Sequence, residues 1–172
     1  FYPIDDAAKV LDLKKRVLMP DRGDHFVGLW VNRNAKRKRS NDVLAAWKLF
    51  MDMLQQKHGH QKATLIMHTD PLDQQGPNLL LTSERLGVNR NVFFSKERLG
   101  FEQMNILHNV SDFGLNISLN EGFGLATLES MQCGKPIIAL RTGGRVRQVG
   151  DHRDGTQNGL AIPVTVRSLV GS

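Results

Sequence analysis

Short apolar runs alternate along the chain with longer segments in which apolar residues recur every three or four positions. The apolar runs predict buried β-strands at 26–31, 63–67, 91–95, 114–119 and 136–140. The segments with helical periodicity lie between them, at about 41–58, 78–86, 101–110 and 123–133. Strands that alternate with helices in this way predict an α/β fold, with a doubly wound, Rossmann-like parallel sheet and right-handed crossovers.

The two ends of this pattern differ in character. Residues 1–24 mix charged residues with scattered apolar ones and contain Pro3, Pro20 and Gly23, which favours a lead-in or interdomain linker segment that ends in a loop. Residues 25–172 are expected to form one domain, because a chain of 172 residues has room for a single substantial core.

The stretch 120–136 carries most of the candidate chemistry. It follows a predicted strand and opens with a turn around Gly122 and Gly124, where the absence of a Cβ lets the backbone turn tightly. A helix begins at this turn, so free N–H groups and the positive end of the helix dipole face one crevice. The pattern predicts a phosphate site flanked by two carboxylates, Glu121 before the turn and Glu129 inside the helix.

The sequence Glu121-Gly-Phe-Gly-Leu-Ala-Thr-Leu-Glu129 resembles the motif of retaining glycosyltransferases with the GT-B fold, of the family-4 type (glycosyl transferases group 1). Gly134-Lys-Pro136 and Thr142-Gly-Gly144 strengthen the resemblance, which covers about residues 26–164. It implies that the chain is one half of a GT-B enzyme, the C-terminal donor-binding half. The N-terminal acceptor domain and the helices that close the C-terminal domain are expected outside this sequence.

The resemblance also implies roles for individual residues around a nucleotide-diphosphate sugar. Glu121 would contact the hydroxyls of the donor sugar, Glu129 the nucleotide ribose, and the turn amides of 122–125 the diphosphate. The loop 95–100 corresponds to the place where the family seats the base. The expected donor-binding residues are Asn120, Gly122, Phe123, Gly124, Leu125, Glu129, Ser95, Lys96, Thr142 and Gly143.

The loop after the first strand, at 32–40, is strongly basic and precedes a helix, so it lies where ligands bind in open α/β sheets. In the family, an Arg and a Lys five residues later grip the diphosphate here, and Arg33 and Lys38 have that spacing. With Glu121 they are the expected catalytic residues. The family usually has Gly before the Arg and Gly after the Lys, where this chain has Asn32 and Arg39. By itself, the basic run would also fit a solvated face or a nucleic-acid site.

Other polar residues have simpler expected roles. His68, Asp70 and Asp73 surround Pro71, but their spacing matches no well-defined metal site, and a turn is expected. The resemblance implies metal-independent catalysis with no cofactor, on a UDP-, GDP- or ADP-sugar. His108 is expected on a helix face rather than as a ligand.

Composition narrows the partners and the location. A net charge of +6 favours anionic partners, namely phosphates, nucleic acid or a membrane surface. Nucleic acid is least favoured, because aromatic residues make up only 6% of the chain and most fall in predicted core elements. The single cysteine, Cys133, fits a reducing compartment. With no signal-peptide pattern and no apolar run of bilayer length, a cytoplasmic location is expected, with peripheral membrane contact allowed by the charge.

The sequence therefore predicts a hexosyltransferase domain that transfers a sugar from a nucleotide-diphosphate sugar with retention of anomeric configuration. The acceptor would be a glycan, a lipid or a small molecule bound by the missing N-terminal domain, and the isolated fragment is expected to be inactive. Two alternatives stay open, a nucleotide-sugar 2-epimerase of the same architecture and a catalytically inactive nucleotide-sugar-binding module. The sugar, the base and the acceptor are not identified by the sequence.

Overall fold

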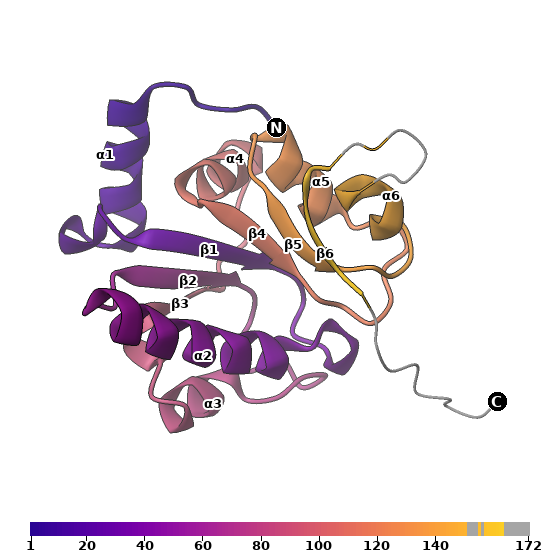
Figure 1. Cartoon of the computed structure of the whole chain (residues 1–172), viewed down its shortest axis with the longest axis horizontal. Coiled ribbons are helices and arrows are strands. Elements are labelled where there is room, and N and C mark those ends of the chain that lie inside the picture. The colour runs from indigo at the N-terminus through magenta and orange to yellow at the C-terminus, as the bar shows by residue number, and fades with distance from the viewer. Residues whose placement is uncertain (151–154, 156, 164–172) are drawn as a thin grey trace.

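The computed structural model describes residues 1–150, 155 and 157–163 as a parallel sheet between two groups of helices (Figure 1). The strands are β1 Phe26–Val31, β2 Ala63–His68, β3 Val92–Ser95, β4 Phe113–Asn116, β5 Ile137–Leu140 and β6 Gly159–Ile162. The helices are α1 Ala7–Leu18, α2 Ser40–His58, α3 Leu79–Arg85, α4 Phe101–Val110, α5 Leu125–Gln132 and α6 Arg145–Val149. Three single 3-10 turns, η1 Pro20–Arg22, η2 Lys36–Lys38 and η3 Asn89–Asn91, complete these elements.

The strand order is β3-β2-β1-β4-β5-β6, and every neighbouring pair is parallel. The predicted doubly wound parallel sheet is therefore confirmed. The chain builds the sheet outward from β1 in one direction and then returns to add β4 on the other side of β1. This reversal opens a crevice at the carboxyl ends of β1 and β4, which is where ligands bind in folds of this kind.

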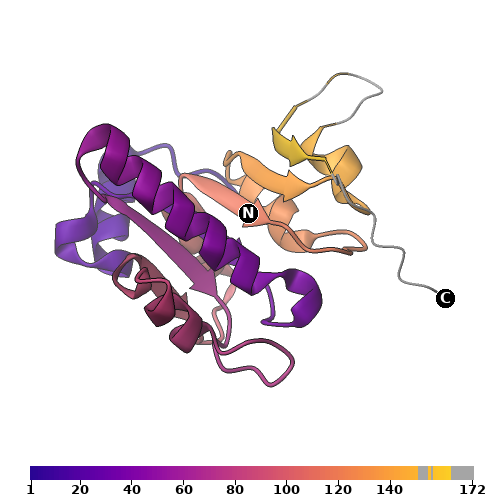
Figure 2. The same cartoon turned by 60° about the horizontal axis from the view of Figure 1, so that its bottom comes forward.

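The two faces of the sheet have separate cores. On one face, α2 and α3 cover the first three strands (Figure 2), and the apolar face predicted for α2 is buried through Val43, Trp47 and Met51. On the other face, α1 and α4 pack on β1 and β2. That second cluster consists of Leu18, Val27, Leu29, Ile66, Leu107 and Val110.

Helix α1 lies within the segment for which the sequence predicted only a lead-in ending in a loop. The Asp6 carboxylate caps the helix by accepting hydrogen bonds from the backbone N–H groups of Ala8 and Lys9. Leu18 is its single buried residue, and Leu13 and Val17 are partly buried against the second cluster. The segment is therefore packed against the domain, and its expected role as a link to another domain stays a prediction.

Replacing Leu18 with alanine is expected to lower the free energy of unfolding by about 2–5 kcal/mol, because the side chain is only 4% exposed and its removal leaves a cavity. Urea denaturation measures this change. Leu11→Ala in the same helix is the matched control, since Leu11 is 43% exposed and should change stability by less than about 1 kcal/mol. Equal small effects of the two substitutions would show that α1 does not contribute to the folded unit.

Candidate functional site

A cleft of about 590 Å³ opens at the carboxyl ends of β1, β2 and β4, beside the start of α5. Its volume is in the range of small-molecule sites. Five of the predicted site residues line it, namely Glu121, Phe123, Gly124, Leu125 and Glu129. The structure therefore brings both carboxylates of the sequence motif to one cleft at the predicted edge of the sheet.

The turn before α5 has the geometry that the sequence predicted for a phosphate site. Gly124 has a φ of +82°, in the left-handed region that favours glycine, and α5 begins at the next residue. The N–H groups of Leu125 and Ala126 are the first of the helix, so neither has a carbonyl partner inside it. Both residues line the cleft, which places these donors beside the two carboxylates.

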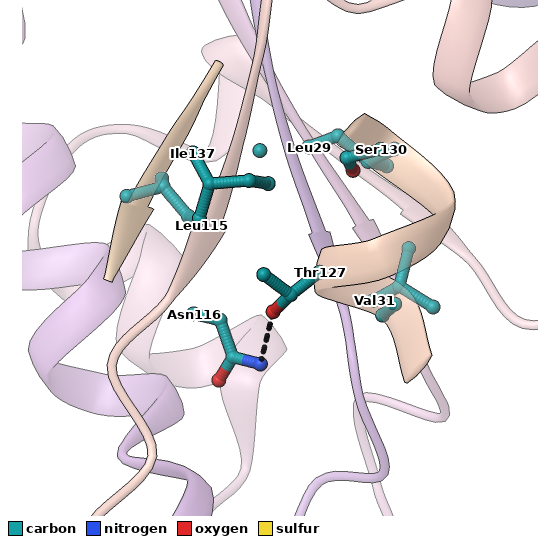
Figure 3. Close-up of a pocket in the computed structure, with 9 residues that line it drawn as sticks. Leu29, Val31, Leu115, Asn116, Thr127, Ser130 and Ile137 are labelled. Atoms are coloured by element: carbon teal, nitrogen blue, oxygen red, sulfur yellow. Dashed lines mark hydrogen bonds between the residues drawn. The ribbon is translucent and has the colours of Figure 1, made fainter. Parts of the chain in front are cut away.

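A buried polar network holds this turn on the sheet (Figure 3). The Asn116 side chain donates from Nδ2 to Thr127 Oγ1 over 3.2 Å, and its Oδ1 accepts from Ser118 Oγ over 2.8 Å. Asn116 ends β4, whereas Thr127 belongs to the first turn of α5. The start of the helix is thus fixed to the end of the strand rather than only to its own loop.

The second glycine turn, around Thr142 and Gly143, packs against the backbone of the turn that carries Glu121. Thr142 Oγ1 donates to the Ser118 carbonyl over 3.2 Å, and the Gly144 N–H donates to the Glu121 carbonyl over 3.3 Å. A Cβ on Gly143 would overlap that same carbonyl oxygen. Thr142 and Gly143 are therefore placed against the backbone of the Glu121 turn, and their predicted contact with the donor stays a prediction.

The basic loop after β1 reaches the same turn. Lys38 is buried in η2, and its Nζ contacts the carboxylate of Glu121. The two side chains are only 8% and 15% exposed, so their mutual attraction is weakly screened. The Leu119 N–H donates to the Arg37 carbonyl over 2.9 Å, which joins the two loops through their backbones as well. The contact between Lys38 and Glu121 was not predicted, and the expected grip of Lys38 on a diphosphate stays a prediction.

Arg33 takes a different direction from Lys38. Its Nε donates to Asp73 Oδ2 over 2.7 Å, and its side chain is 62% exposed. Asp73 lies in the loop after β2, which pairs with β1 on the side opposite to β4 and the Glu121 turn. The neighbouring Asn32 lines the cleft instead. The predicted grip of Arg33 on a diphosphate stays a prediction.

The Arg33 guanidinium holds the pKa of Asp73 below the ordinary range of an aspartic acid, chiefly through its hydrogen bond. A lowered native pKa means that the pair stabilises the fold at neutral pH, and that this contribution is lost as the pH falls through the lowered value. We expect the pKa of the Asp73 carboxyl, followed by carbon-detected NMR, to lie below the ordinary value of an aspartic acid. In Arg33→Ala this pKa should rise toward the ordinary value, and an unchanged pKa would exclude the ion pair in solution.

Glu129 has a partner that sequence reasoning did not identify. Its side chain is 25% exposed and lines the cleft, and its Oε2 lies 3.3 Å from Nε2 of His108, a residue of α4. His108 was expected on a helix face; it is fully buried, with Nδ1 2.8 Å from Ser130 Oγ. The available signal was the spacing of polar residues in α4, because Asn105, His108 and Asn109 are all buried.

The other eight residues that line the cleft were not predicted as site residues, and the polar ones among them are Asn32, His68, Arg98 and Asn116. His68 Nδ1 lies 3.0 Å from Ser95 Oγ, so the predicted Ser95 adjoins the cleft through His68. Burial lowers the pKa of His68, which favours its neutral imidazole. Arg98 belongs to the loop expected to seat a base, whereas Lys96 of that loop is exposed and outside the lining.

The loop of Asp70 and Asp73 is a turn, as the sequence predicted. Asp70 Oδ1 accepts from the Leu72 N–H over 3.0 Å, and Asp73 Oδ1 accepts from the Gln75 N–H over 2.9 Å. Within the described ranges, His, Cys, Asp and Glu side chains do not gather in a group of three that could hold a metal ion. In the same part of the chain, none of the helices is long and apolar enough to cross a membrane.

A family model confirms the resemblance in the motif. The model for "Glycosyl transferases group 1" matches residues 20–170. The chain belongs to this family. Among curated relatives, it is 38% identical over 84 residues to a D-inositol 3-phosphate glycosyltransferase of Corynebacterium jeikeium (strain K411), a match over 49% of this chain and 19% of the relative. The corresponding enzyme of Salinispora arenicola (strain CNS-205) is 35% identical over 78 residues, 45% of this chain and 17% of the relative.

Solved structures of GT-B glycosyltransferases share the fold. Anabaena Alr3699/HepE in complex with UDP-glucose has a TM-score of 0.70 at 21% identity, over 93% of this chain and 40% of that one. Sucrose-phosphate synthase from Thermosynechococcus elongatus has a TM-score of 0.70 at 23% identity, over 96% of this chain and 37% of that one. The C-terminal domain of LpcC from Francisella tularensis has a TM-score of 0.67 at 18% identity, over 96% of this chain and 78% of that one. The chain therefore spans less than half of the longer proteins, and it shares its fold with an isolated C-terminal domain.

Proposed function

We propose that this domain binds a nucleotide-diphosphate sugar in the cleft and, together with an acceptor-binding domain, transfers the sugar with retention of configuration and without a metal ion. The observation that carries the proposal is the contact of Lys38 with Glu121 beside the start of α5. It places a buried cation, a carboxylate and free N–H groups at one end of one cleft. Family membership and the UDP-glucose complex of the similar HepE protein support a sugar nucleotide as the donor.

The proposed donor runs along the cleft. Its diphosphate lies over the start of α5, where helix N–H groups and the helix dipole favour an anion. The sugar lies toward Glu121, and the ribose lies toward Glu129 farther along the same helix. The base lies toward His68 and Arg98, on the walls formed by the ends of β2 and the loop before α4.

The chemistry follows from the fixed positive groups at the diphosphate. As the bond between the anomeric carbon and the phosphate oxygen breaks, its electron pair stays on the leaving diphosphate, where negative charge grows. The N–H groups at the start of α5 face this charge, and Lys38 beside Glu121 adds a fixed positive charge close to it, so together they stabilise the transition state. In this proposal they supply the positive charge that a metal ion supplies in other phosphate sites. The acceptor hydroxyl replaces the diphosphate on the same face of the sugar, and its proton passes to an oxygen of the leaving diphosphate.

Family membership disfavours the nucleic-acid alternative, because the family model that matches residues 20–170 describes glycosyl transferases. A 2-epimerase or an inactive binding module would share the donor cleft, and assay of sugar transfer separates them from a transferase. The cytoplasmic location and peripheral membrane contact stay predictions.

The test of the proposal is a calorimetric titration of this chain with UDP, GDP and ADP. We expect one of the three nucleotides to bind. Glu129→Ala should lower the affinity for that nucleotide at least about tenfold, because the hydrogen bonds of a charged group are lost. Glu84→Ala is the matched control, because Glu84 is exposed on α3 on the opposite face of the sheet and should leave the affinity unchanged. No binding by any of the three nucleotides at millimolar concentration and low salt would overturn the proposal.

A further inference from the structure

We propose that His108 is a positioning residue for Glu129: it holds the Glu129 carboxylate in the orientation that binds the ribose hydroxyls of the donor. The inference rests on the proposed function, because it assigns Glu129 to the ribose. It goes further in naming the residue, on a neighbouring helix, that decides how well this carboxylate is oriented. The packing of α4 against α5 then contributes to nucleotide affinity although α4 supplies only Met104 to the wall of the cleft.

The contacts of His108 come from two adjacent residues of α5. Its Nδ1 is 2.8 Å from the hydroxyl of Ser130, and its Nε2 is 3.3 Å from Oε2 of Glu129. His108 is fully buried and Ser130 is 2% exposed, so water does not compete for the contact between them. Glu129 is partly exposed to the cleft and its partner is not, so the imidazole contacts the carboxylate on the side that faces away from the cleft.

The chemistry of these groups selects one arrangement of protons. An ionised carboxylate only accepts hydrogen bonds, so Glu129 favours the tautomer of His108 with the proton on Nε2. Nδ1 then accepts from the Ser130 hydroxyl, which can donate to it. The three residues thus form an ordered series in which Ser130 orients the imidazole and the imidazole presents an N–H to Glu129.

The Nε2 atom gives the reason to expect a positioning effect. It is buried and has no aligned hydrogen-bond partner in this conformation, even though the Glu129 carboxylate is close. A buried N–H without an acceptor is costly, so a rotation of the carboxylate that completes the bond is favourable. Such a rotation restricts the orientations of Glu129, and it directs its second oxygen away from α4.

The imidazole itself is held by its surroundings. The ring of Phe1 packs edge-on against it with ring centroids 5.4 Å apart. The Tyr2 N–H donates to Asn105 Oδ1 over 3.0 Å, and Asn109 Nδ2 donates to the Tyr2 carbonyl over 3.0 Å, which ties this segment to α4. A positioning residue must itself be fixed by packing and hydrogen bonds, and His108 meets this requirement.

Three substitutions separate the two nitrogens of His108. His108→Gln can place an N–H near the position of Nε2, His108→Asn keeps a polar group only near the position of Nδ1, and His108→Phe keeps the ring without either nitrogen. Each is titrated with the nucleoside diphosphate that binds best among UDP, GDP and ADP, and with its 2′,3′-dideoxy form, which lacks both ribose hydroxyls. Thermal unfolding of each variant shows that it is folded.

We expect His108→Asn and His108→Phe to lower the affinity for the ribose-containing nucleotide about tenfold, which is the effect of a lost hydrogen bond to a charged group. His108→Gln should retain most of this affinity. The dideoxy nucleotide should bind all variants nearly equally. In a Glu129→Ala background, His108→Asn should have no further effect, since the residue acts only through that carboxylate. If His108→Phe does not fold, Ser130→Ala tests the same series and should weaken the ribose-containing nucleotide selectively.

The outcomes distinguish the inference from the function on which it rests. Suppose that Glu129→Ala lowers the affinity for the ribose-containing nucleotide alone. If His108→Asn then lowers the affinity for both nucleotides equally, or for neither, His108 is a structural residue and the inference alone is overturned. If Glu129→Ala does not distinguish the two nucleotides, the ribose is bound elsewhere, and both the assignment of Glu129 and the inference are overturned.

Discussion

Replacing Lys38 with alanine is expected to lower the affinity of this domain for a nucleoside diphosphate by roughly 10–100-fold, and the turnover of the enzyme that contains it by roughly 10²–10³-fold. The ammonium group is buried beside Glu121 at the start of α5, so its charge is weakly screened where the diphosphate is proposed to lie. Its contribution should grow as the leaving group gains charge. This is why turnover is expected to fall further than binding.

Two controls separate this role from a structural one. Lys36→Ala removes an equal charge from the same 3-10 turn, but Lys36 is exposed, and its backbone rather than its side chain bonds to Gln75. Binding of the nucleoside without phosphates should be unchanged in Lys38→Ala. Calorimetry on the domain and a transfer assay on the enzyme provide the measurements.

The loss of Lys38 also leaves the buried carboxylate of Glu121 without its cation, which is destabilising in itself. The double variant Lys38→Ala with Glu121→Gln removes this cost. If diphosphate binding recovers in the double variant, or is normal in Lys38→Ala, then Lys38 only neutralises Glu121 and the proposed grip on the diphosphate is wrong.

The strands could be predicted because their signal is local. Fully buried residues such as Leu29, Trp30 and Ile66 fall in continuous apolar runs, the pattern of strands covered on both faces of a sheet. Helix α1 was missed although its signal is present. Val10, Leu13 and Val17 recur at helical spacing, and Leu13 and Val17 pack against the second cluster. The charged residues between them, with Pro3, Pro20 and Gly23 outside the helix, favoured a linker instead.

The site could be predicted where it depends on backbone geometry. The position of Gly124 at a left-handed turn and the start of α5 follow from the order of residues along the chain. The direction of long side chains does not. Arg33 and Lys38 belong to one loop, yet Lys38 is buried against Glu121 while Arg33 extends to Asp73, because that choice depends on which loops the sheet brings together.

Contacts between helices were least accessible from the sequence. His108 and Glu129 meet only because α4 and α5 cover the same side of the sheet in adjacent positions. The glycines of the second turn were predicted for their likeness to the family motif, but the reason for Gly143 is steric. Its backbone lies against the carbonyl of Glu121, a residue 22 positions earlier.

Replacing Gly143 with alanine is therefore expected to displace the Glu121 turn and to lower nucleotide affinity and turnover by at least about tenfold, because proximity of this kind is sensitive to shifts of about 1 Å. The new Cβ would overlap the Glu121 carbonyl oxygen. That oxygen also accepts a hydrogen bond from the Gly144 N–H, so the two turns cannot move apart without breaking this bond. Gly143 has a φ of +55°, so the substitution adds backbone strain of about 1 kcal/mol as well.

Gly134→Ala separates the overlap from the strain. Gly134 also has a left-handed φ, of +71°, but no atom lies within 4 Å of the place its Cβ would take. Gly134 follows α5 at the end remote from the cleft. The Gly134→Ala variant should lose about 1 kcal/mol of stability, with an unchanged affinity for nucleotide. Urea denaturation and calorimetric titration of both variants measure the difference. If the two variants lose the same stability and both bind nucleotide normally, then the Thr142–Gly144 turn does not support Glu121, and the carboxylate is held by Lys38 and its own loop alone.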